Sequence, residues 1–241
     1  MGFGTPHRHY SRVDSTNSRA RELAAAGAPH GTVVTAAEQT EGRGRQGRAW
    51  TAPPGKALLY SAIVRPLGAG DTLLPLAVPL AVCEAAEDLE PGLECGVKWP
   101  NDVQVEGRKL AGVLIEARPQ DGWAVIGVGL NLAIAADEFP PELRDTATSL
   151  FPATACPLSP SGLQTEAADA LSRRLETWLE ADQGAVLGAW RERDALRGRE
   201  IAWEDGSGVA DGIDDRGYLV VVVPSGERVV LGAGEVHLTR I

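Results

Sequence analysis

The fold is decided by residues 103–132, VQVEGRKLAGVLIEARPQDGWAVIGVGLNL. The first half, residues 103–117, predicts a β-hairpin that turns at Glu106-Gly107, because tight turns favour glycine. The second half, residues 123–132, is apolar almost throughout, as is typical of a central strand buried on both faces. This stretch therefore predicts a β-sheet at the centre of the molecule.

Further elements are predicted on both sides of this stretch. Helices are expected where capping residues or apolar stripes occur, over residues 15–27, 71–90 and 161–193. Two strands rich in small and β-branched residues are expected over 32–39 and 57–64. After Leu196, short strand-like runs separated by Gly, Asp and Ser turns predict a small β-barrel. We therefore expect an α+β body over residues 1–194 and an all-β domain over 195–241.

Composition limits the functions that the chain can have. The 241 residues carry a net charge of -10, which disfavours a DNA-binding or membrane-surface protein. The cysteines Cys83, Cys95 and Cys156 lack the spacing of a disulfide framework or a zinc site, so we interpret them as buried thiols. No apolar run has the length of a membrane span, and the first residues lack the apolar core of a signal peptide. We expect a cytoplasmic protein.

Residues 42–50, GRGRQGRAW, match the spacing G-x-G-x-x-G of a dinucleotide-binding loop. That motif requires a helix directly after the loop, and Pro53-Pro54 follows instead. Three arginines among glycines favour a mobile loop that binds an anion, because glycine allows close backbone approach and arginine supplies forked donors. A solvated surface loop and a nucleic-acid-binding segment are the alternatives, and the acidic net charge weighs against the second.

Three other segments carry polar groups next to predicted strands: VKWPND (97–102), GRKLAGVL (107–114) and GVGLNL (127–132). Only three of the 23 basic residues are lysines, and two of them, Lys98 and Lys109, lie in these segments. Each segment alone has a structural explanation, as a turn, a solvated hairpin lysine or strand packing. Glycines inside a buried strand also favour a pocket floor.

Together and in this order, these segments resemble a biotin protein ligase (biotin-[acetyl-CoA-carboxylase] ligase). Residues 14–17, DSTN, and Gln39 add to the resemblance, which covers residues 11–132 and continues to GAGEV at 232–236. It implies a class II synthetase-like catalytic domain of the biotin/lipoate ligase type, with a mixed sheet flanked by helices and an SH3-like barrel after it. With so few residues before Tyr10, we expect a ligase without the winged-helix DNA-binding domain of some relatives.

The family activates biotin with MgATP to form biotinyl-5′-adenylate and then transfers biotin to a lysine of a biotin carboxyl carrier protein. The resemblance implies that catalysis rests on Lys109, Arg45 and Lys98. It implies that biotin is bound by Ser15, Thr16, Asn17, Gln39, Gly42, Arg43, Gly44, Arg45, Lys109, Gly112 and Gly129. It implies that ATP and its lid involve Arg43, Arg45, Arg48, Trp50, Lys98, Asn101, Asp102 and Asn131, with Asp102 also holding Mg²⁺. For Ser15 and Thr16, capping of the first helix is the rival interpretation.

The resemblance also implies a homodimer through the central sheet. Glu41 departs from the family pattern, and we interpret it as a tether for a loop arginine in the open state of the loop, with an effect on loop kinetics and not on function. A lipoate ligase of the same superfamily is the enzymatic alternative, although an arginine-rich segment of the S-G-G-G type is missing. A nucleic-acid or small-molecule binding module without catalysis is the other alternative, and it would function without Lys109.

Overall fold

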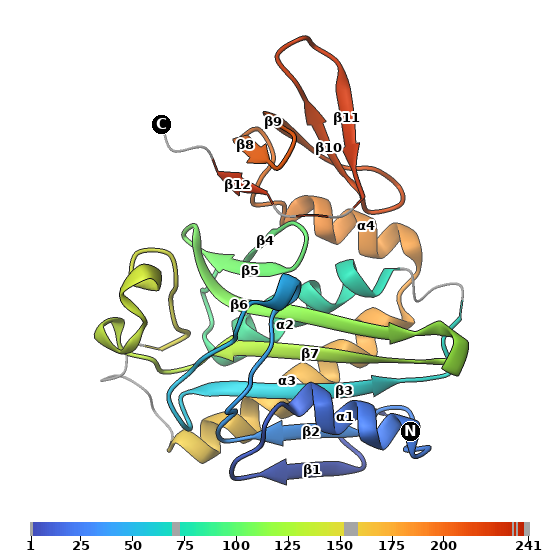
Figure 1. Cartoon of the computed structure of the whole chain (residues 1–241), viewed down its shortest axis with the longest axis vertical. Helices are drawn as coiled ribbons and strands as arrows, with labels where there is room; N and C mark the ends of the chain where they lie inside the picture. Colours follow the sequence, from blue (N-terminus) through green and yellow to red (C-terminus); the bar gives the residue numbers. More distant parts are fainter. Residues whose placement is uncertain (1, 69–72, 152–158, 233, 235, 239–241) are drawn as a thin grey trace.

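A computed structural model describes residues 2–68, 73–151, 159–232, 234 and 236–238 (Figure 1). Its larger sheet has the strand order β1-β2-β3-β7-β6-β5-β4. These strands are β1 (His7–Tyr10), β2 (Val33–Ala36), β3 (Ala57–Val64), β4 (Gly96–Lys98), β5 (Asp102–Val105), β6 (Arg108–Arg118) and β7 (Trp123–Asn131). β1 runs parallel to β2 whereas the other neighbours are antiparallel, so the sheet is mixed, as predicted.

The predicted hairpin and central strand lie together in this sheet. Glu106 and Gly107 form the turn between β5 and β6 with φ angles of 51° and 75°, as a tight hairpin requires. β7 pairs with β6 on one side and with β3 on the other, and nearly all its residues are buried. The stretch 103–132 therefore forms the middle of the sheet.

Four helices of two or more turns occur in the described residues: α1 (Thr16–Ala25), α2 (Leu74–Leu89), α3 (Pro160–Glu180) and α4 (Gln183–Glu192). The helical region predicted over 161–193 consists of two helices, α3 and α4. They are separate because Ala181 and Asp182 are extended and the Asp182 side chain caps α4 by accepting from the Ala185 N–H at 2.9 Å. The predicted helix over 71–90 is α2, with residues 71 and 72 outside the described residues.

The edge strand β1 was not predicted from the sequence. Its residues HRHY are mostly exposed, so they lack the apolar pattern that marks a strand. Strand pairing with β2 holds the segment in place, in register from His7 opposite Val33 to Tyr10 opposite Ala36.

The two faces of the large sheet are covered differently (Figure 1). Helices α2 and α3 pack on one face, where Tyr60, Ile126 and Leu130 belong to the main core. Helix α1 covers part of the other face, over a smaller core that contains Ile63 and Val125. The rest of that second face, which we call the site face, is free to carry the loop between β2 and β3.

The C-terminal strands form a second, antiparallel sheet in the order β11-β10-β9-β8-β12 (Figure 1). They are β8 (Glu200–Trp203), β9 (Gly206–Ile213), β10 (Leu219–Val222), β11 (Arg228–Leu231) and β12 (His237–Leu238). The described strand pairs do not close this sheet into a barrel. The Trp99 indole N–H donates to the Gly217 carbonyl at 3.2 Å and joins the two sheets. The predicted boundary after residue 194 lies between α4 and β8 and stays a prediction.

Two remaining expectations concern the cysteines and membranes. Cys83 and Cys95 are buried free thiols, as predicted, and Cys156 lies outside the described residues. Within the described part of the chain, no helix combines the length and apolar character needed to cross a membrane.

Candidate active site

The loop at residues 42–50 is a tongue whose two ends are hydrogen-bonded to each other. The Trp50 N–H donates to the Gly42 carbonyl at 2.9 Å, and the Gly44 N–H donates to the Arg48 carbonyl at 2.7 Å. Only one short 3-10 turn, Arg45–Gly47, lies inside it. No helix lies between the glycines and β3. The loop is therefore not a dinucleotide-binding loop, because that motif requires a helix directly after its glycines.

The Trp50 side chain lies on the site face of the sheet, above two glycines. Gly112 and Gly129 are paired directly across β6 and β7. A Cβ atom on Gly129 would overlap the Trp50 indole, and one on Gly112 would lie 3.1 Å from its Cζ3 atom. These glycines are therefore required for the close approach of Trp50 to the strands. The Trp50 Nε1–H is buried and has no acceptor among the described residues.

Lys109 lies beside this indole, between a carboxylate and the aromatic ring. Its Nζ atom is 2.7 Å from Oδ1 of Asp102 and 5.7 Å from the centroid of the Trp50 ring. Its backbone is held by the segment 146–148, through a bond from the Lys109 N–H to the Thr146 carbonyl at 2.7 Å. The lysine is thus fixed at its backbone while its ammonium group stays partly exposed.

The tongue reaches the same cluster through Arg45. Arg45 Nη1 donates to Oδ1 of Asn101 at 3.0 Å, and the amide of Asn101 donates to Asp102 at 3.2 Å. Lys98 is the β4 partner of Asp102 in the strand register. The fold therefore brings together the predicted residues Arg45, Lys98, Asn101, Asp102 and Lys109.

A second polar network lies at the start of α1. Both the N–H and the hydroxyl of Thr16 donate to Oε1 of Gln39, at 2.7 and 3.0 Å. The Ser61 hydroxyl lies 2.8 Å from Oγ1 of Thr16 and 2.6 Å from Oδ1 of Asn17. Ser15 occupies the N-cap position of α1, but its side chain makes no capping hydrogen bond. Capping therefore does not account for the buried Ser15 hydroxyl.

Asp14 lies at the start of this network, where its carboxylate accepts from the Ser15 N–H at 2.7 Å. Burial alone would raise the pKa of Asp14, but hydrogen bonds from the Ser15 N–H and from Arg19 lower that pKa below its usual value. Arg19 Nη2 lies 2.8 Å from Asp14 Oδ2. The Asp14 carbonyl accepts from the Glu41 N–H at 2.8 Å, so this corner also holds the start of the tongue.

Comparisons with known proteins bear on this arrangement. The model of the Biotin/lipoate A/B protein ligase family matches residues 10–132, and that of the Biotin protein ligase C terminal domain matches residues 198–238. The chain belongs to the biotin/lipoate A/B protein ligase family.

The relatives named here are ligases. The biotin--[acetyl-CoA-carboxylase] ligase of Mycobacterium tuberculosis is 36% identical, over 99% of this chain and 92% of the relative. The bifunctional ligase/repressor BirA of Bacillus spizizenii is 31% identical, over 92% of this chain and 70% of the relative. The biotin protein ligase from Aquifex aeolicus in complex with biotin and ATP superposes with a TM-score of 0.79 and 28% identity, over 98% and 99% of the two chains.

These matches confirm the predicted resemblance, fold type and ligase activity, and they do not favour a lipoate ligase. The roles of individual residues in this family member stay predictions. Asn131, for example, is buried, and its amide donates to the Thr148 carbonyl at 2.9 Å. That bond gives Asn131 a structural role.

Two features of the ligase site were missed by the sequence interpretation. Glu116 contacts both the tongue and α1 through Arg43 and Asn17, so its carboxylate lies beside a tongue arginine. The tether proposed for Glu41 stays a prediction. A pocket of about 300 Å³ lies between the two sheets, and its lining includes Arg45, Asn101, Arg216 and Tyr218. Both features join segments far apart in the chain, which local patterns do not reveal.

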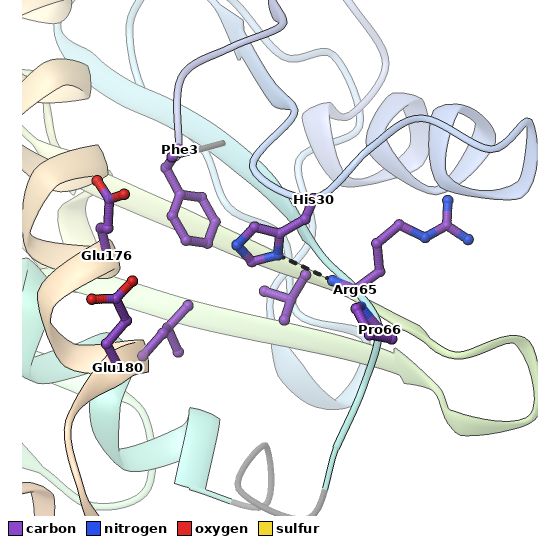
Figure 2. Close-up of a pocket in the computed structure, with 9 residues that line it drawn as sticks. Phe3, His30, Arg65, Pro66, Glu176 and Glu180 are labelled. Atoms are coloured by element: carbon purple, nitrogen blue, oxygen red, sulfur yellow. Dashed lines mark hydrogen bonds between the residues drawn. The ribbon is translucent and has the colours of Figure 1, made fainter.

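Another pocket of about 340 Å³ lies elsewhere (Figure 2). Figure 2 shows Phe3 and His30 on one side and the carboxylates of Glu176 and Glu180 on the other. None of the predicted site residues lines it. The candidate active site of this ligase is therefore the tongue, the site face beneath it and the pocket between the sheets.

Proposed function

We propose that the protein is an ATP-dependent biotin protein ligase. In the first step, the biotin carboxylate attacks the α-phosphorus of ATP, the bond to the β-phosphate oxygen breaks, and pyrophosphate leaves with the electron pair. In the second step, a lysine amine of a biotin carboxyl carrier protein attacks the biotinyl carbonyl carbon, and AMP leaves. The observation that carries this proposal is the arginine tongue packed beside Lys109 on the site face of a chain of this family.

Charge neutralisation is the first task of such a site. A carboxylate and a triphosphate repel each other, so cations must hold them before they react. Arg43, Arg45 and Arg48 supply guanidinium groups from the tongue, and Lys109 supplies a compact ammonium group. We assign to Lys109 the contact with both the biotin carboxylate and the α-phosphate, where it can stabilise charge that develops during attack. Asp102 holds that ammonium group until the anions arrive.

Shielding of the adenylate is the second task, because the mixed anhydride is hydrolysed by water. Trp50 lies over Gly112 and Gly129 and so covers the floor of the site face. Its buried indole N–H is a donor that a ligand oxygen would satisfy. We propose that the tongue is the lid of the reaction chamber.

The polar network at α1 fits the biotin end of the site. Thr16, Asn17 and Gln39 carry donors and acceptors that are already ordered by their mutual bonds and by Ser61. A ureido ring offers both a carbonyl acceptor and N–H donors, and preordered partners lower the entropic cost of binding it. Ser15 is included in this proposed subsite because it is buried next to these residues.

The pocket between the sheets fits the nucleotide end. Its volume of about 300 Å³ is at the lower end of the range for small-molecule sites. Arg45 and Asn101 belong both to this pocket and to the cluster around Lys109. An ATP molecule placed there would have its phosphates next to the proposed catalytic lysine.

Magnesium enters this site with ATP. The described residues contain no cluster of three or more His, Cys, Asp or Glu side chains suited to a metal ion. Mg²⁺ commonly binds through one or two carboxylates together with substrate phosphates, so the single carboxylate of Asp102 fits such an ion. Asp102 would hold the Mg²⁺ ion, and the positive charge of that ion would help to neutralise the triphosphate.

We also propose that the reaction takes place in the cytoplasm. The free thiols of Cys83 and Cys95 fit the reducing conditions of the cytoplasm. The homodimer implied by the family resemblance stays a prediction, which sedimentation with and without biotin would test.

The function is tested by incubating the protein with MgATP and either labelled biotin or labelled lipoate, with a carrier domain added last. We expect a biotinyl-adenylate, pyrophosphate release that depends on biotin, and a labelled carrier lysine. A lipoyl product alone would exclude the biotin activity. Binding of biotin without any pyrophosphate release would favour a module that only binds.

The lid is tested by Arg45→Ala. Loss of the bond to Asn101 frees one side of the tongue, so the adenylate should be lost to solvent faster, by roughly 10-fold for one charge-assisted hydrogen bond. The measurement is the half-life of preformed adenylate after excess reagents are removed. An unchanged half-life would contradict the assignment of the tongue as a lid.

A further inference from the structure

Glu116 accepts hydrogen bonds from three side chains, two on α1 and one on the tongue. It lies on β6 on the same face as Gly112, four residues further along the strand. Its Oε2 atom accepts from Asn17 Nδ2 at 2.9 Å and from Arg43 Nη2 at 3.3 Å. Its Oε1 atom accepts from Arg21 Nη1 at 3.1 Å. The side chain is only 24% exposed, so solvent screens these bonds less than it would at a fully exposed position.

The bond to Asn17 fixes which way its amide points. A carboxylate only accepts hydrogen bonds, so the NH₂ group of Asn17 must face Glu116. Its Oδ1 atom then faces Ser61, whose hydroxyl lies 2.6 Å away. Gly127 permits this placement, because a Cβ atom there would overlap Oδ1 of Asn17. The charge on Glu116 thus orders a group of the proposed biotin subsite.

The bond to Arg43 fixes the first arginine of the tongue. Arg43 Nη2 also donates to Oγ of Ser18 at 3.2 Å, so the guanidinium lies between α1 and β6. Arg21 approaches the same carboxylate, and one negative charge therefore faces two positive ones. The remaining positive charge suits a site that receives anions.

We propose that Glu116 is a positioning residue that couples the tongue to the biotin subsite by holding Arg43 and Asn17 at the same time. This rests on the proposed ligase function. Because Glu116 acts through these two partners, its loss should weaken biotin binding and loosen the tongue while the chemical step at Lys109 continues.

The test compares Glu116→Gln with Glu84→Gln in the full-length protein. Glutamine keeps an acceptor for Asn17 but removes the charge that faces the arginines. Glu84 is a matched control because its side chain is 21% exposed and bonds Arg174 at 3.0 Å, between α2 and α3 on the opposite face of the sheet. Biotin-dependent pyrophosphate exchange gives KM and kcat, and the half-life of preformed adenylate reports on the tongue.

For Glu116→Gln we expect a KM for biotin raised roughly 10-fold, a shorter adenylate half-life and a kcat within about 3-fold of wild type. Arg43→Ala should also raise KM, and the effects of the two changes in the double variant should add only in part, because both remove the contact between Glu116 and Arg43. Glu84→Gln should leave all three quantities unchanged.

Two results would overturn the proposal: a KM and half-life for Glu116→Gln equal to those of Glu84→Gln, or effects that add fully to those of Arg43→Ala. A lower melting temperature shared by both glutamine variants without any KM change would likewise assign Glu116 a structural role only. If wild-type protein released no pyrophosphate with biotin, the ligase function itself would fail, and that failure is visible before any variant is compared.

Discussion

The two faces of strand β7 differ, although alternate residues of one nine-residue strand form them. Toward α2 and α3 the strand presents Ala124, Ile126, Val128 and Leu130, all buried in the main core. Toward the tongue it presents Gly127 and Gly129, over which Asn17 and Trp50 lie. The first face is filled along its length by the strand's own side chains, whereas at Gly127 and Gly129 the second face is filled by side chains from other segments.

This difference separates stability from function within one strand. Apolar side chains on the helix face contribute burial that holds the sheet to its helices. Glycines on the site face contribute no side-chain burial, and they allow other groups to approach the backbone. Substitutions on alternate residues of β7 should therefore have different consequences.

The largest effect is expected on stability, from Ile126→Ala on the helix face. Ile126 is fully buried, so its truncation should cost about 2–5 kcal/mol through lost burial and a residual cavity. Urea denaturation measures the loss, and KM for biotin well below the melting temperature should stay at the wild-type value. A raised KM without lost stability would break the separation of the two faces.

The next largest effect is expected on activity, from Gly129→Ala on the site face. The new methyl group would overlap the Trp50 indole and displace it, and a displacement of about 1 Å can cost roughly 100-fold in rate. Gly112→Ala should cost less, because its Cβ would lie 3.1 Å from the nearest indole atom. Biotin-dependent pyrophosphate exchange measures both variants. Equal activity of Gly129→Ala and wild type would show that the position of the Trp50 indole over Gly129 is not required for the reaction.

The parts of the fold that could be predicted from the sequence are those set by local signals. The apolar run of β7 and the turn at Glu106-Gly107 are local signals, and both predicted the centre of the sheet correctly. The break between α3 and α4 was missed because the capping bond of Asp182 competes with an apolar stripe that continues across it. Strand β1 was missed because pairing with β2 holds polar residues in place.

Residues of the candidate site could be proposed from the sequence where they lie in a family motif. Residues that join the site through long-range contacts could not. Lys109, Arg45 and Asn101 stand in segments that carry the family resemblance. Glu116 stands in an ordinary strand pattern, and its partner Asn17 is 99 residues away in the chain. Only the folded sheet places the two side chains together.

The smallest effect is expected from Tyr60→Phe, a polar change on the helix face. The Tyr60 hydroxyl lies 3.0 Å from that of Ser172, and loss of this buried bond should cost about 1 kcal/mol. Burial raises the pKa of Tyr60 well above its usual value of 10.0. The unfolded chain therefore loses this proton first as the pH rises above 10, so wild-type stability should fall there more steeply than that of Tyr60→Phe. Parallel curves for the two proteins would contradict the buried, protonated tyrosine.

The central claim is that Lys109 on the site face stabilises the transition state of adenylation. Its most direct test is the rate of biotin-dependent pyrophosphate exchange in Lys109→Ala, with Lys56→Ala as the control, since Lys56 pairs with Glu138 outside the cluster. We predict that Lys109→Ala lowers the rate by about 100- to 1000-fold and that Lys56→Ala stays within about 3-fold of wild type. Adenylate formation by Lys109→Ala at the wild-type rate would contradict the claim.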